Sequence, residues 1–281
     1  MKFPFSKMHG LGNDFVVFNF IERSFDMSPE LARQIADRHL GVGCDQILIV
    51  EKSSRSGIDF KYRILNSDGS EVAQCGNGAR CFASFVHDEG LSNKNILHVE
   101  TLNGEIVLER NQDDGSVTVN MGVPQFSPAA IPITAEKEQD VYKLEVGADS
   151  LEFYAMSIGN PHAVICVKDI SQAPVLSLGP MLEKHPFFPE RANIGFMQII
   201  DRDTITLRVF ERGVGETSAC GSGACAAVVC GIRAGDLNQQ VRVILPGGHL
   251  DIQWQGTPSP VMMTGPSSTV FKGELFVEKS A

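Results

Sequence analysis

A five-residue motif occurs twice in this chain, and the repeat constrains the fold more than any other feature of the sequence. Residues 75–79 read Cys-Gly-Asn-Gly-Ala, and residues 220–224 read Cys-Gly-Ser-Gly-Ala, at an offset of 145. Three further pairs align at this offset: Arg63 with Arg208, Asn66 with Glu211, and Glu71 with Glu216. Because the matches keep their order in both halves of the chain, they predict two homologous halves.

The matches continue upstream with small changes of offset, as insertions would produce. Gly12-Asn13 resembles Gly159-Asn160 at an offset of 147, and Gly43-x-x-Gln46 resembles Gly195-x-x-Gln198 at an offset of 152. Each half is therefore expected to contain strands, a turn, and a Cys-Gly motif that leads into a helix. Two such halves around one cleft would present two similar groups to a single ligand.

Length and local patterns indicate the fold class. A chain of 281 residues suits two modest domains, and a hydrophobic content of 43% provides for a sizeable core, so we expect an α+β or α/β protein. Ser28 before Pro29 predicts a helix start, and Asn103-Gly104 predicts a hairpin turn. Helices are expected at 29–39, 79–90, 178–185 and 223–235, and strands at 14–20, 46–50, 58–66, 96–101 and 105–110. Three prolines mark residues 122–134 as a domain linker.

Charge and cysteine content argue against several kinds of partner and site. A formal net charge of −10 makes nucleic acid an unfavourable partner, because an acidic protein repels polyphosphate. No apolar run approaches the ~18 residues of a membrane helix, and residues 1–7 lack a signal-peptide pattern, so a cytoplasmic protein is expected. Seven cysteines without a secretion signal argue against a disulfide framework. Without a Cys-x2-Cys pair or a Gly-x-Gly-x-x-Gly fingerprint, we expect no metal and no cofactor.

Cys75 and Cys220 are each expected to lie immediately before a helix. Free N–H groups and the macrodipole at a helix N-terminus favour negative charge, so each thiol pKa is expected to fall towards neutrality. The same N–H groups bind a carboxylate, and the glycines allow its close approach. One cysteine, as thiolate, would remove the α-proton of an amino acid, while the other, as thiol, would protonate the opposite face. Both helix ends would stabilise the negative charge that develops on the carboxylate.

Longer blocks make the chain similar to a known family. In the first half they are residues 7–15 (KMHGLGNDF), 36–43 (ADRHLGVG) and 66–81 (NSDGSEVAQCGNGARC). In the second half they are residues 159–162 (GNPH), 191–196 (RANIGF) and 211–224 (ERGVGETSACGSGA). Together these blocks resemble the diaminopimelate epimerase family, and they extend through nearly the whole chain.

The resemblance implies a fold, an activity and an assembly. The activity is the interconversion of LL- and meso-2,6-diaminopimelate without a cofactor, in lysine and bacterial peptidoglycan biosynthesis. The fold is α+β, with two pseudo-symmetric domains that each form a strand-rich, barrel-like shell around a central helix. Because the last segment returns to the first half in this family, the expected domains are 1–122 with about 266–281, and 123–265. A homodimer is also expected, although Phe271 stands where some members have a tyrosine that supports dimerisation.

The resemblance also assigns roles to individual residues. Cys75 and Cys220 become the acid/base pair, and His162 and Glu211 assist them. The reacting carboxylate is expected at four residues of the repeated motif: Gly76, Asn77, Gly221 and Ser222. Other substrate-binding positions carry amide, carboxylate or guanidinium groups that suit the amino-acid ends of the substrate: Asn13, Gln46, Asn66, Asn160, Asn193, Glu211 and Arg212. Five cysteines are expected to be structural: Cys44, Cys81, Cys166, Cys225 and Cys230.

The residues alone leave other interpretations open. Tight-turn glycines, cysteines buried in a core and asparagines in turns would also explain the two motifs. Three other functions remain: an isomerase of proline, hydroxyproline or another amino acid; a thiol redox or metal-binding protein; and a binding protein without catalysis. The many side-chain amides argue against a small apolar substrate, and the presence of both cysteines argues against the third function.

Overall fold

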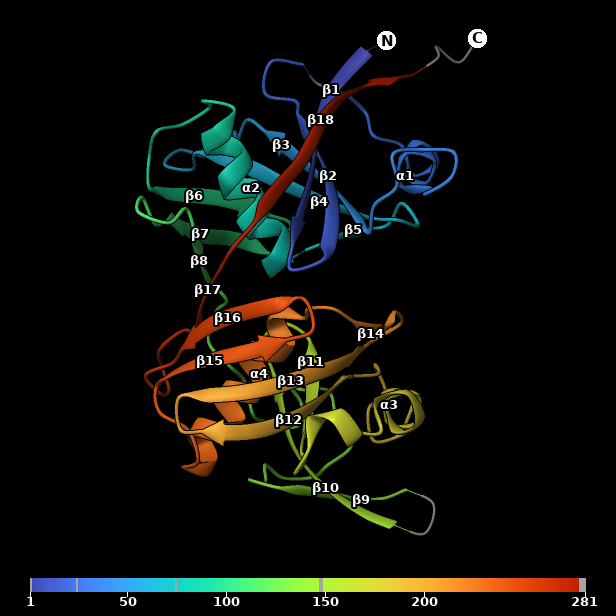
Figure 1. Cartoon of the computed structure of the whole chain (residues 1–281), viewed down its shortest axis with the longest axis vertical. Helices are drawn as coiled ribbons and strands as arrows, with labels where there is room; N and C mark the ends of the chain where they lie inside the picture. Colours follow the sequence, from blue (N-terminus) through green and yellow to red (C-terminus); the bar gives the residue numbers. More distant parts are fainter. Residues whose placement is uncertain (1, 24, 74, 147–148, 278–281) are drawn as a thin grey trace. The chain divides into compact units, whose positions relative to one another are not determined.

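The chain divides into two compact units that each combine many strands with few helices (Figure 1). The structure is a computed structural model, and it describes residues 2–23, 25–73, 75–146 and 149–277. The first unit is Met1–Asn120 with Thr264–Ala281, and the second is Met121–Met263. The expected α+β class is confirmed.

The first unit is built mainly from short strands. Its elements are β1 (Lys2–Gly10), β2 (Asn13–Asn19), α1 (Pro29–Ala36), β3 (Gln46–Glu51), β4 (Phe60–Asn66), β5 (Glu71–Val72), α2 (Gly76–Asp88), β6 (Ile96–Thr101), β7 (Gly104–Arg110), β8 (Val117–Asn120) and β18 (Ser268–Phe276). Strand β17 (Met262–Gly265) includes the boundary between the units.

The second unit repeats this order of elements after one added strand. Its elements are β9 (Tyr142–Val146), β10 (Asp149–Ser157), β11 (Pro161–Cys166), the 3-10 helix η1 (Ile170–Gln172), α3 (Val175–Glu183), β12 (Asn193–Asp201), β13 (Thr204–Glu211), β14 (Gly215–Thr217), α4 (Gly221–Ala234), β15 (Gln240–Leu245) and β16 (Gly248–Gln253).

The two units share one pattern of strand pairing. In the first unit β1 and β2 are antiparallel, β2 and β3 are parallel, and β3, β4 and β5 are antiparallel, while β4 is also parallel to β6. In the second unit β10 to β15 repeat this order with the same directions. The internal repeat of the sequence is therefore a repeat of topology.

The strand register corrects one alignment between the halves. Gln46 is the first residue of β3, and Asn193 is the first residue of β12, the strand that holds the same place in the second unit. Asn193 is thus the counterpart of Gln46, at an offset of 147. The match of Gln46 with Gln198 at an offset of 152 was wrong, because strand pairing and not glycine spacing sets which residues correspond.

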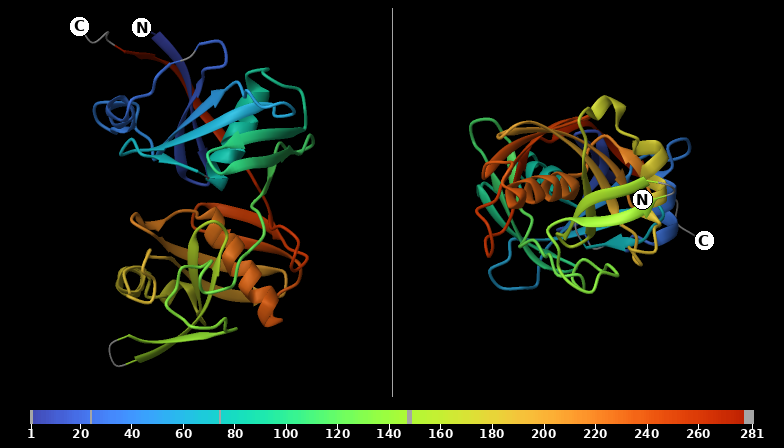
Figure 2. Two further views of the ribbon diagram at one scale, coloured as in Figure 1. Left: turned by 180° about the vertical axis from the view of Figure 1, so that it is seen from behind. Right: turned by 90° about the horizontal axis from the view of Figure 1, so that it is seen from below.

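A largely buried helix packs against the strands of each unit (Figure 2). Helix α2 contacts β1, β2, β3, β7 and β8, and α4 contacts β10 to β13, β15 and β16. Both helices carry apolar residues on nearly every side, such as Phe82 and Val86 in α2 and Val228 and Val229 in α4, all of them fully buried. A helix that is apolar all round is stable only inside a protein core, which explains the central position of α2 and α4.

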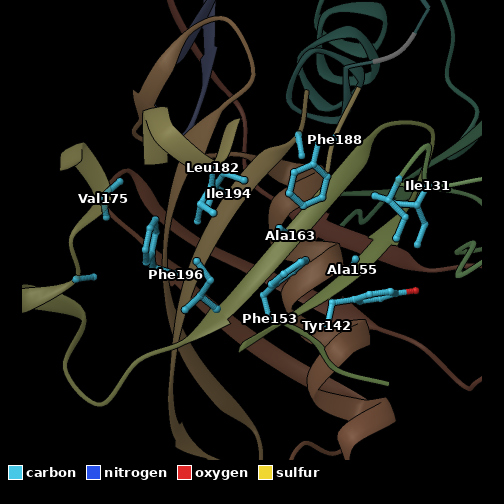
Figure 3. Close-up of a cluster of buried hydrophobic side chains, with 14 residues drawn as sticks. Ile131, Tyr142, Phe153, Ala155, Ala163, Val175, Leu182, Phe188, Ile194 and Phe196 are labelled. Atoms are coloured by element: carbon cyan, nitrogen blue, oxygen red, sulfur yellow. The ribbon is translucent and has the colours of Figure 1, made fainter. Parts of the chain in front are cut away.

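A second apolar core lies in the second unit, beneath α3. Phe153 on β10 and Phe196 on β12 pack with Leu182 of α3 and with Phe188 (Figure 3). Ile131 belongs to the same cluster and is fully buried. The segment 122–134, predicted as a domain linker, follows the boundary between the units directly, and its residues Ile131 and Ile133 are packed into this core.

Helix starts and ends differ from the expectation by a few residues. Helix α1 ends at Ala36 and not near His39, because the Asp37 carboxylate accepts hydrogen bonds from the backbone N–H groups of His39 and Leu40, each at 2.7 Å. Helices α2 and α4 begin two to three residues earlier than expected, directly after Cys75 and Cys220. Helix α3 begins at Val175, three residues earlier than expected.

The C-terminal strand β18 belongs to the first unit. It pairs antiparallel with β1 from the Lys2–Phe276 pair to the His9–Ser268 pair. The buried Arg80 of α2 donates from Nε to the carbonyl oxygen of Pro266 at 3.1 Å. Among the described residues, no helix has the length and hydropathy required to cross a membrane.

Candidate active site

Cys75 and Cys220 occupy the same position in their units, as the N-cap residues of α2 and α4. Both have extended backbone angles, with φ −146° and ψ 110° at Cys75 and φ −111° and ψ 107° at Cys220. Neither helix has an acidic residue in its first turn. Each helix start therefore combines a thiol with backbone N–H groups that favour an anion.

The third residue of each helix is a glycine because a strand side chain lies against the first turn. A Cβ on Gly78 would lie 2.3 Å from the hydroxyl oxygen of Tyr62, which is on β4. A Cβ on Gly223 would lie 3.0 Å from Val209 and 3.2 Å from the Cys220 Sγ. The backbone N–H of Gly78 also donates to the Cys75 Sγ at 3.4 Å. These glycines bring the helix start close to the sheet, which a side chain at Gly78 would prevent.

In the first unit, the residues expected to bind substrate lie at one edge of the sheet. Asn13 and Gln46 open the parallel strands β2 and β3, and Asn66 closes β4 opposite Gln46. The Asn13 Oδ1 accepts from the Asn77 Nδ2 at 3.3 Å and from the Cys75 thiol at 3.8 Å. The strand pairing thus places the asparagine of β2 next to the cysteine.

Gln46 and Asn66 form a linked amide pair. The Gln46 Nε2 donates to the Asn66 Oδ1 at 2.9 Å, and the Asn66 Nδ2 donates to the Ser70 hydroxyl at 3.1 Å. The Gln46 Oε1 is buried and has no hydrogen-bond partner among the described residues. A buried acceptor of this kind is suited to an N–H donor of a ligand.

In the second unit, a chain of hydrogen bonds connects His162 to Cys220. The buried His162 ring lies with Nε2 3.0 Å from the Asn160 Oδ1, which assigns the proton to Nε2 because an amide oxygen only accepts. The Asn160 Nδ2 donates to the Ser222 Oγ at 3.3 Å, and the Ser222 Oγ lies 3.7 Å from the Cys220 Sγ. Ser222 is the second residue of α4, so the helix start itself belongs to this chain.

Asn193, Glu211 and Arg212 meet where β12 begins and the antiparallel strand β13 ends. The backbone N–H of Arg212 donates to the Asn193 Oδ1 at 3.0 Å, and the Asn193 Nδ2 donates to the carbonyl oxygen of Pro161 at 3.2 Å. Glu211 accepts a hydrogen bond from the Thr217 hydroxyl. The Arg212 guanidinium donates to the carbonyl oxygen of Glu190 at 3.1 Å. The residues predicted in the second half therefore lie together within that unit.

Burial changes the expectation for the Cys220 thiol. The Cys220 pKa is raised well above its ordinary value, first by burial and then by the charge of Glu211, while hydrogen bonds from Ser222 and Gly223 act in the opposite direction. The expectation that the helix N-terminus brings the Cys220 pKa down towards neutrality was wrong. Desolvation outweighs the helix end here, so Cys220 rests as a thiol.

The sequence did not indicate the side chains that hold the turns beside the two cysteines. Arg63 forms a bidentate ion pair with Glu71, at 2.8 and 3.1 Å, and Arg208 forms the same pair with Glu216, at 2.7 and 3.0 Å. Each pair joins the two strands that precede the cysteine. The four residues were aligned in the sequence repeat, but only the strand pairing shows that each arginine forms an ion pair with a glutamate of the same unit.

A buried carboxylate was also missed. Glu183, at the end of α3, has a side chain only 3% exposed, and it accepts from the backbone N–H of Gly213 at 2.9 Å. Arg191 lies 3.5 Å from the same oxygen. In the first unit, Arg33 of α1 donates to the carbonyl oxygen of Asp68 at 3.0 Å. Helix α1 therefore holds the turn that follows Asn66, and helix α3 holds the turn that follows Glu211.

The five other cysteines, which were expected to be structural, differ in burial. Cys166 is exposed at the end of β11, and the other four are buried: Cys44, Cys81, Cys225 and Cys230. Within the described part of the chain, no group of three histidine, cysteine or acidic side chains is arranged to hold a metal ion.

Comparison with known proteins gives the family of this chain. A family model described as diaminopimelate epimerase matches residues 5–127 and 154–270. The chain belongs to the diaminopimelate epimerase family. The two matched segments each contain one copy of the repeated motif and its cysteine.

Curated members of the diaminopimelate epimerase family are similar over nearly the full length. The protein named diaminopimelate epimerase from Nitrosomonas eutropha is 57% identical over 98% of this chain and 99% of its own. Its namesake from Aromatoleum aromaticum is 53% identical over 99% of this chain and all of its own. The protein is therefore an isomerase of the epimerase type.

Solved structures share the fold of the diaminopimelate epimerase family at low sequence identity. A phenazine biosynthesis protein of the PhzF family from Bacillus anthracis has a TM-score of 0.71 at 16% identity, over 99% of this chain and all of its own. A hydroxyproline epimerase from Agrobacterium vitis has a TM-score of 0.70 at 15% identity, over 98% of this chain and 92% of its own. These likenesses concern the fold.

The buried His162 gives a testable pH dependence of stability. Burial, followed by the charge of Arg212, lowers the His162 pKa from 6.5 to about 3. Below pH 6.5 His162 binds a proton in the unfolded chain but stays neutral in the folded chain. The folded state therefore loses stability as the pH falls towards 3. We expect His162→Gln to lose less of its free energy of unfolding than the parent between pH 7 and pH 4, measured by urea denaturation. Equal slopes would contradict the assignment of a neutral buried imidazole.

Proposed function

We propose that this chain interconverts LL- and meso-2,6-diaminopimelate by two proton transfers at one α-carbon, with Cys75 and Cys220 as the transferring groups. The observation that carries the proposal is that both family-matched segments place a cysteine at the N-cap of a buried helix. The names of the close relatives support the choice of diaminopimelate as substrate.

The reacting carboxylate is proposed to bind at the starts of α2 and α4. The backbone N–H groups of Gly76, Asn77, Gly221 and Ser222 lie in the first turns, where no acidic side chain competes for them. A carboxylate there receives hydrogen bonds and the favourable end of the helix dipole. The same groups stabilise the additional negative charge that forms on this carboxylate when the α-proton leaves.

The proton transfers exchange the states of the two sulfur atoms. One cysteine enters as thiolate and takes the α-proton, and the electron pair of the broken C–H bond passes into the carboxylate as an enediolate. The other cysteine, as thiol, gives its proton to the opposite face of the α-carbon. The product has the inverted configuration, the first cysteine is now a thiol and the second a thiolate. Proton exchange with solvent restores the starting state.

Glu211 and His162 are proposed to assist Cys220. The charge of Glu211 raises the pKa of Cys220, so these two groups are close enough to interact. A Glu211 carboxylate can accept the proton that Cys220 must lose before it acts as a base. A neutral His162, whose pKa is lowered to about 3 by burial, supplies the start of the hydrogen-bond chain through Asn160 and Ser222.

The distal amino-acid end is proposed to bind the remaining polar residues. Arg212 suits a carboxylate, and the buried, unpartnered Gln46 Oε1 suits an ammonium group. The other proposed contacts are amides: Asn13, Asn66, Asn160 and Asn193. A substrate with an amino-acid group at each end uses both the residues proposed for the reacting carboxylate and those proposed for the distal end. Proline has no second amino-acid group for the distal residues to bind.

The wider role of the protein is proposed with this activity. The reaction belongs to lysine biosynthesis and, in bacteria, to peptidoglycan biosynthesis, and it takes place in the cytoplasm. The two thiols supply both proton transfers, so no cofactor is required. We also propose a homodimer through β18, where Val270, Phe271 and Phe276 are exposed. Phe271 packs edge-on against Phe5 at 5.9 Å and has no hydroxyl for a bond across an interface.

Proton exchange in heavy water tests the proposal directly. With LL-2,6-diaminopimelate as substrate, the meso product is expected to carry one deuterium at the inverted α-carbon, detected by NMR and mass spectrometry. Activity is expected to persist in chelator and to be lost when thiols are alkylated. Proline and trans-4-hydroxyproline serve as comparison substrates. Turnover of either one without turnover of diaminopimelate would overturn the proposed substrate.

A further inference from the structure

A directed chain of hydrogen bonds crosses the first unit beside Cys75. The buried Arg80 donates from Nη2 to the Asn77 Oδ1 at 3.1 Å, and the Asn77 Nδ2 donates to the Asn13 Oδ1 at 3.3 Å. The Asn13 Nδ2 then donates to the Asp45 Oδ2 at 2.9 Å. Every bond points from the cation Arg80 towards the anion Asp45.

The two charged ends determine which way both amides face. A guanidinium only donates, so the oxygen of Asn77 must turn towards Arg80. A carboxylate only accepts, so the nitrogen of Asn13 must turn towards Asp45. The carbonyl oxygen of Asn13 is consequently left facing Cys75, whose thiol donates to it at 3.8 Å.

Asp45 is itself held from several directions. Its Oδ1 lies 2.8 Å from the Arg38 Nη2, and its Oδ2 also accepts from the backbone N–H of Asp14 at 3.1 Å. The backbone N–H of Asp45 donates to the Asp14 Oδ1 at 2.9 Å. Asp14 forms further ion pairs with Arg38 and Lys7, and together they hold its pKa well below the usual range against the effect of burial. The carboxylate of Asp45 therefore has a fixed position.

We propose that Asp45 is a positioning residue that fixes the Asn13 carboxamide with its oxygen towards Cys75, and so keeps Cys75 in the thiol form until substrate binds. An acceptor next to a thiol stabilises the S–H form, whereas a donor would stabilise the thiolate. The inference deepens the proposed function, on which its catalytic meaning rests. The start of α2 favours the thiolate form of Cys75, whereas the Asn13 oxygen favours the thiol form. A substrate that binds Asn13 removes this oxygen from Cys75 and so leaves the effect of the helix start unopposed.

The charged and titratable groups around this chain come from every element packed against it. They are Lys7 and His9 of β1, Asp14 of β2, Arg38, Cys44 and Asp45 of the loop before β3, Tyr62 of β4, and Arg80 and Cys81 of α2. The pKa of Cys44 is raised by burial to about 12, as is that of Cys81, and burial raises the pKa of Tyr62. Burial therefore favours the neutral form of all three groups, and the hydrogen bond from the Cys75 thiol to the Asn13 Oδ1 is the contact through which the orientation of Asn13 acts.

The experiment measures the alkylation of Cys75 by iodoacetamide as a function of pH. Cys166 is exposed, so all variants carry Cys166→Ala, and peptide mass spectrometry follows Cys75 alone. In Asp45→Asn, the new amide competes to donate to Asn13, and the Asn13 nitrogen turns in part towards Cys75. Because the Asp45 side chain is 45% exposed, the expected effect is moderate. We expect alkylation below the midpoint pH to become about tenfold faster, which corresponds to about one pH unit.

The Asn13→Ala background separates orientation from simple charge. Loss of the Asp45 charge would favour the thiolate in either background, but reorientation requires Asn13. We expect Asp45→Asn to change the rate less than about twofold when Asn13 is alanine. If Asp45→Asn changed the rate of Cys75 alkylation equally with Asn13 present and with Asn13→Ala, or changed it in neither case, the inference would be overturned. Asp45→Ala, which removes the acceptor without adding a donor, is the second variant and should shift the rate less but in the same direction.

Alkylation does not depend on turnover. A chain that fails to epimerise diaminopimelate but shows the expected alkylation pattern would refute the proposed function and retain the positioning role. The opposite result, turnover with equal alkylation changes in the two backgrounds, would refute only the role of Asp45.

Discussion

Alanine in place of Cys75 or of Cys220 is expected to reduce epimerisation by roughly a thousandfold or more, because each replacement removes a proton-transferring group, and such groups contribute about 10² to 10⁴ each. The measurement is the rate of formation of meso-2,6-diaminopimelate from the LL form at saturating substrate. A single variant still has one thiol, so slow exchange of the α-proton without inversion is expected from one epimer only.

The same two helices provide matched control variants. Cys81 of α2 and Cys225 of α4 are fully buried and lie six and five residues after the N-cap cysteines. Their replacement by alanine removes a small buried side chain, and turnover is expected to stay within a few-fold of the parent. If Cys75→Ala or Cys220→Ala kept near-normal turnover, the two-cysteine mechanism would be excluded.

Gly78→Ala is expected to destabilise the protein by about 1–3 kcal/mol and to lower turnover by about a hundredfold. The new Cβ would lie 2.3 Å from the Tyr62 hydroxyl oxygen, so either the tyrosine or the first turn of α2 must move. The backbone N–H of Gly78 donates to the Cys75 Sγ, so movement of this turn displaces the thiol. Urea denaturation and steady-state kinetics measure the two effects.

The repeat supplies the comparison for this variant. Gly223→Ala is the equivalent change in the second unit, where the nearest neighbour of the new Cβ would be Val209 at 3.0 Å, so a smaller loss of stability is expected. Adding Tyr62→Phe to Gly78→Ala removes the atom in closest conflict and should restore most of the lost stability. A double variant as unstable as Gly78→Ala alone would show that the Tyr62 hydroxyl is not the cause.

The repeated motif predicted the topology because a duplicated sequence has to bury the same faces in both copies. The cysteines, Asn66 and Glu211 could be aligned at one offset because few insertions separate them. Gln46 was aligned with the wrong residue, since a glycine three positions earlier recurs by chance and only strand pairing identifies Asn193 as its counterpart. The helices were predicted to start at residues 79 and 223, whereas each cysteine is the N-cap residue in the structure.

Other features depend on contacts between residues far apart in the chain. Asp45 and Glu183 are ordinary acidic residues in the sequence, and their roles follow from partners at Asn13 and Gly213. The proline-containing segment 122–134 has the composition of a linker, and only the surrounding strands show that Ile131 is buried. The pKa of Cys220 could not be predicted either, because it depends on how completely the core excludes water around the thiol.

The pairing of β18 with β1 has a consequence for how the chain folds during synthesis. The first unit needs residues 268–276 to complete its sheet, whereas the second unit is a single continuous stretch that ends at Met263. All residues of the second unit are therefore synthesised before the first unit has its last strand. Strand β1 therefore keeps one edge unpaired until residues 268–276 have been synthesised. A stop codon near residue 264 would leave the first unit, and not the second, without its closing strand.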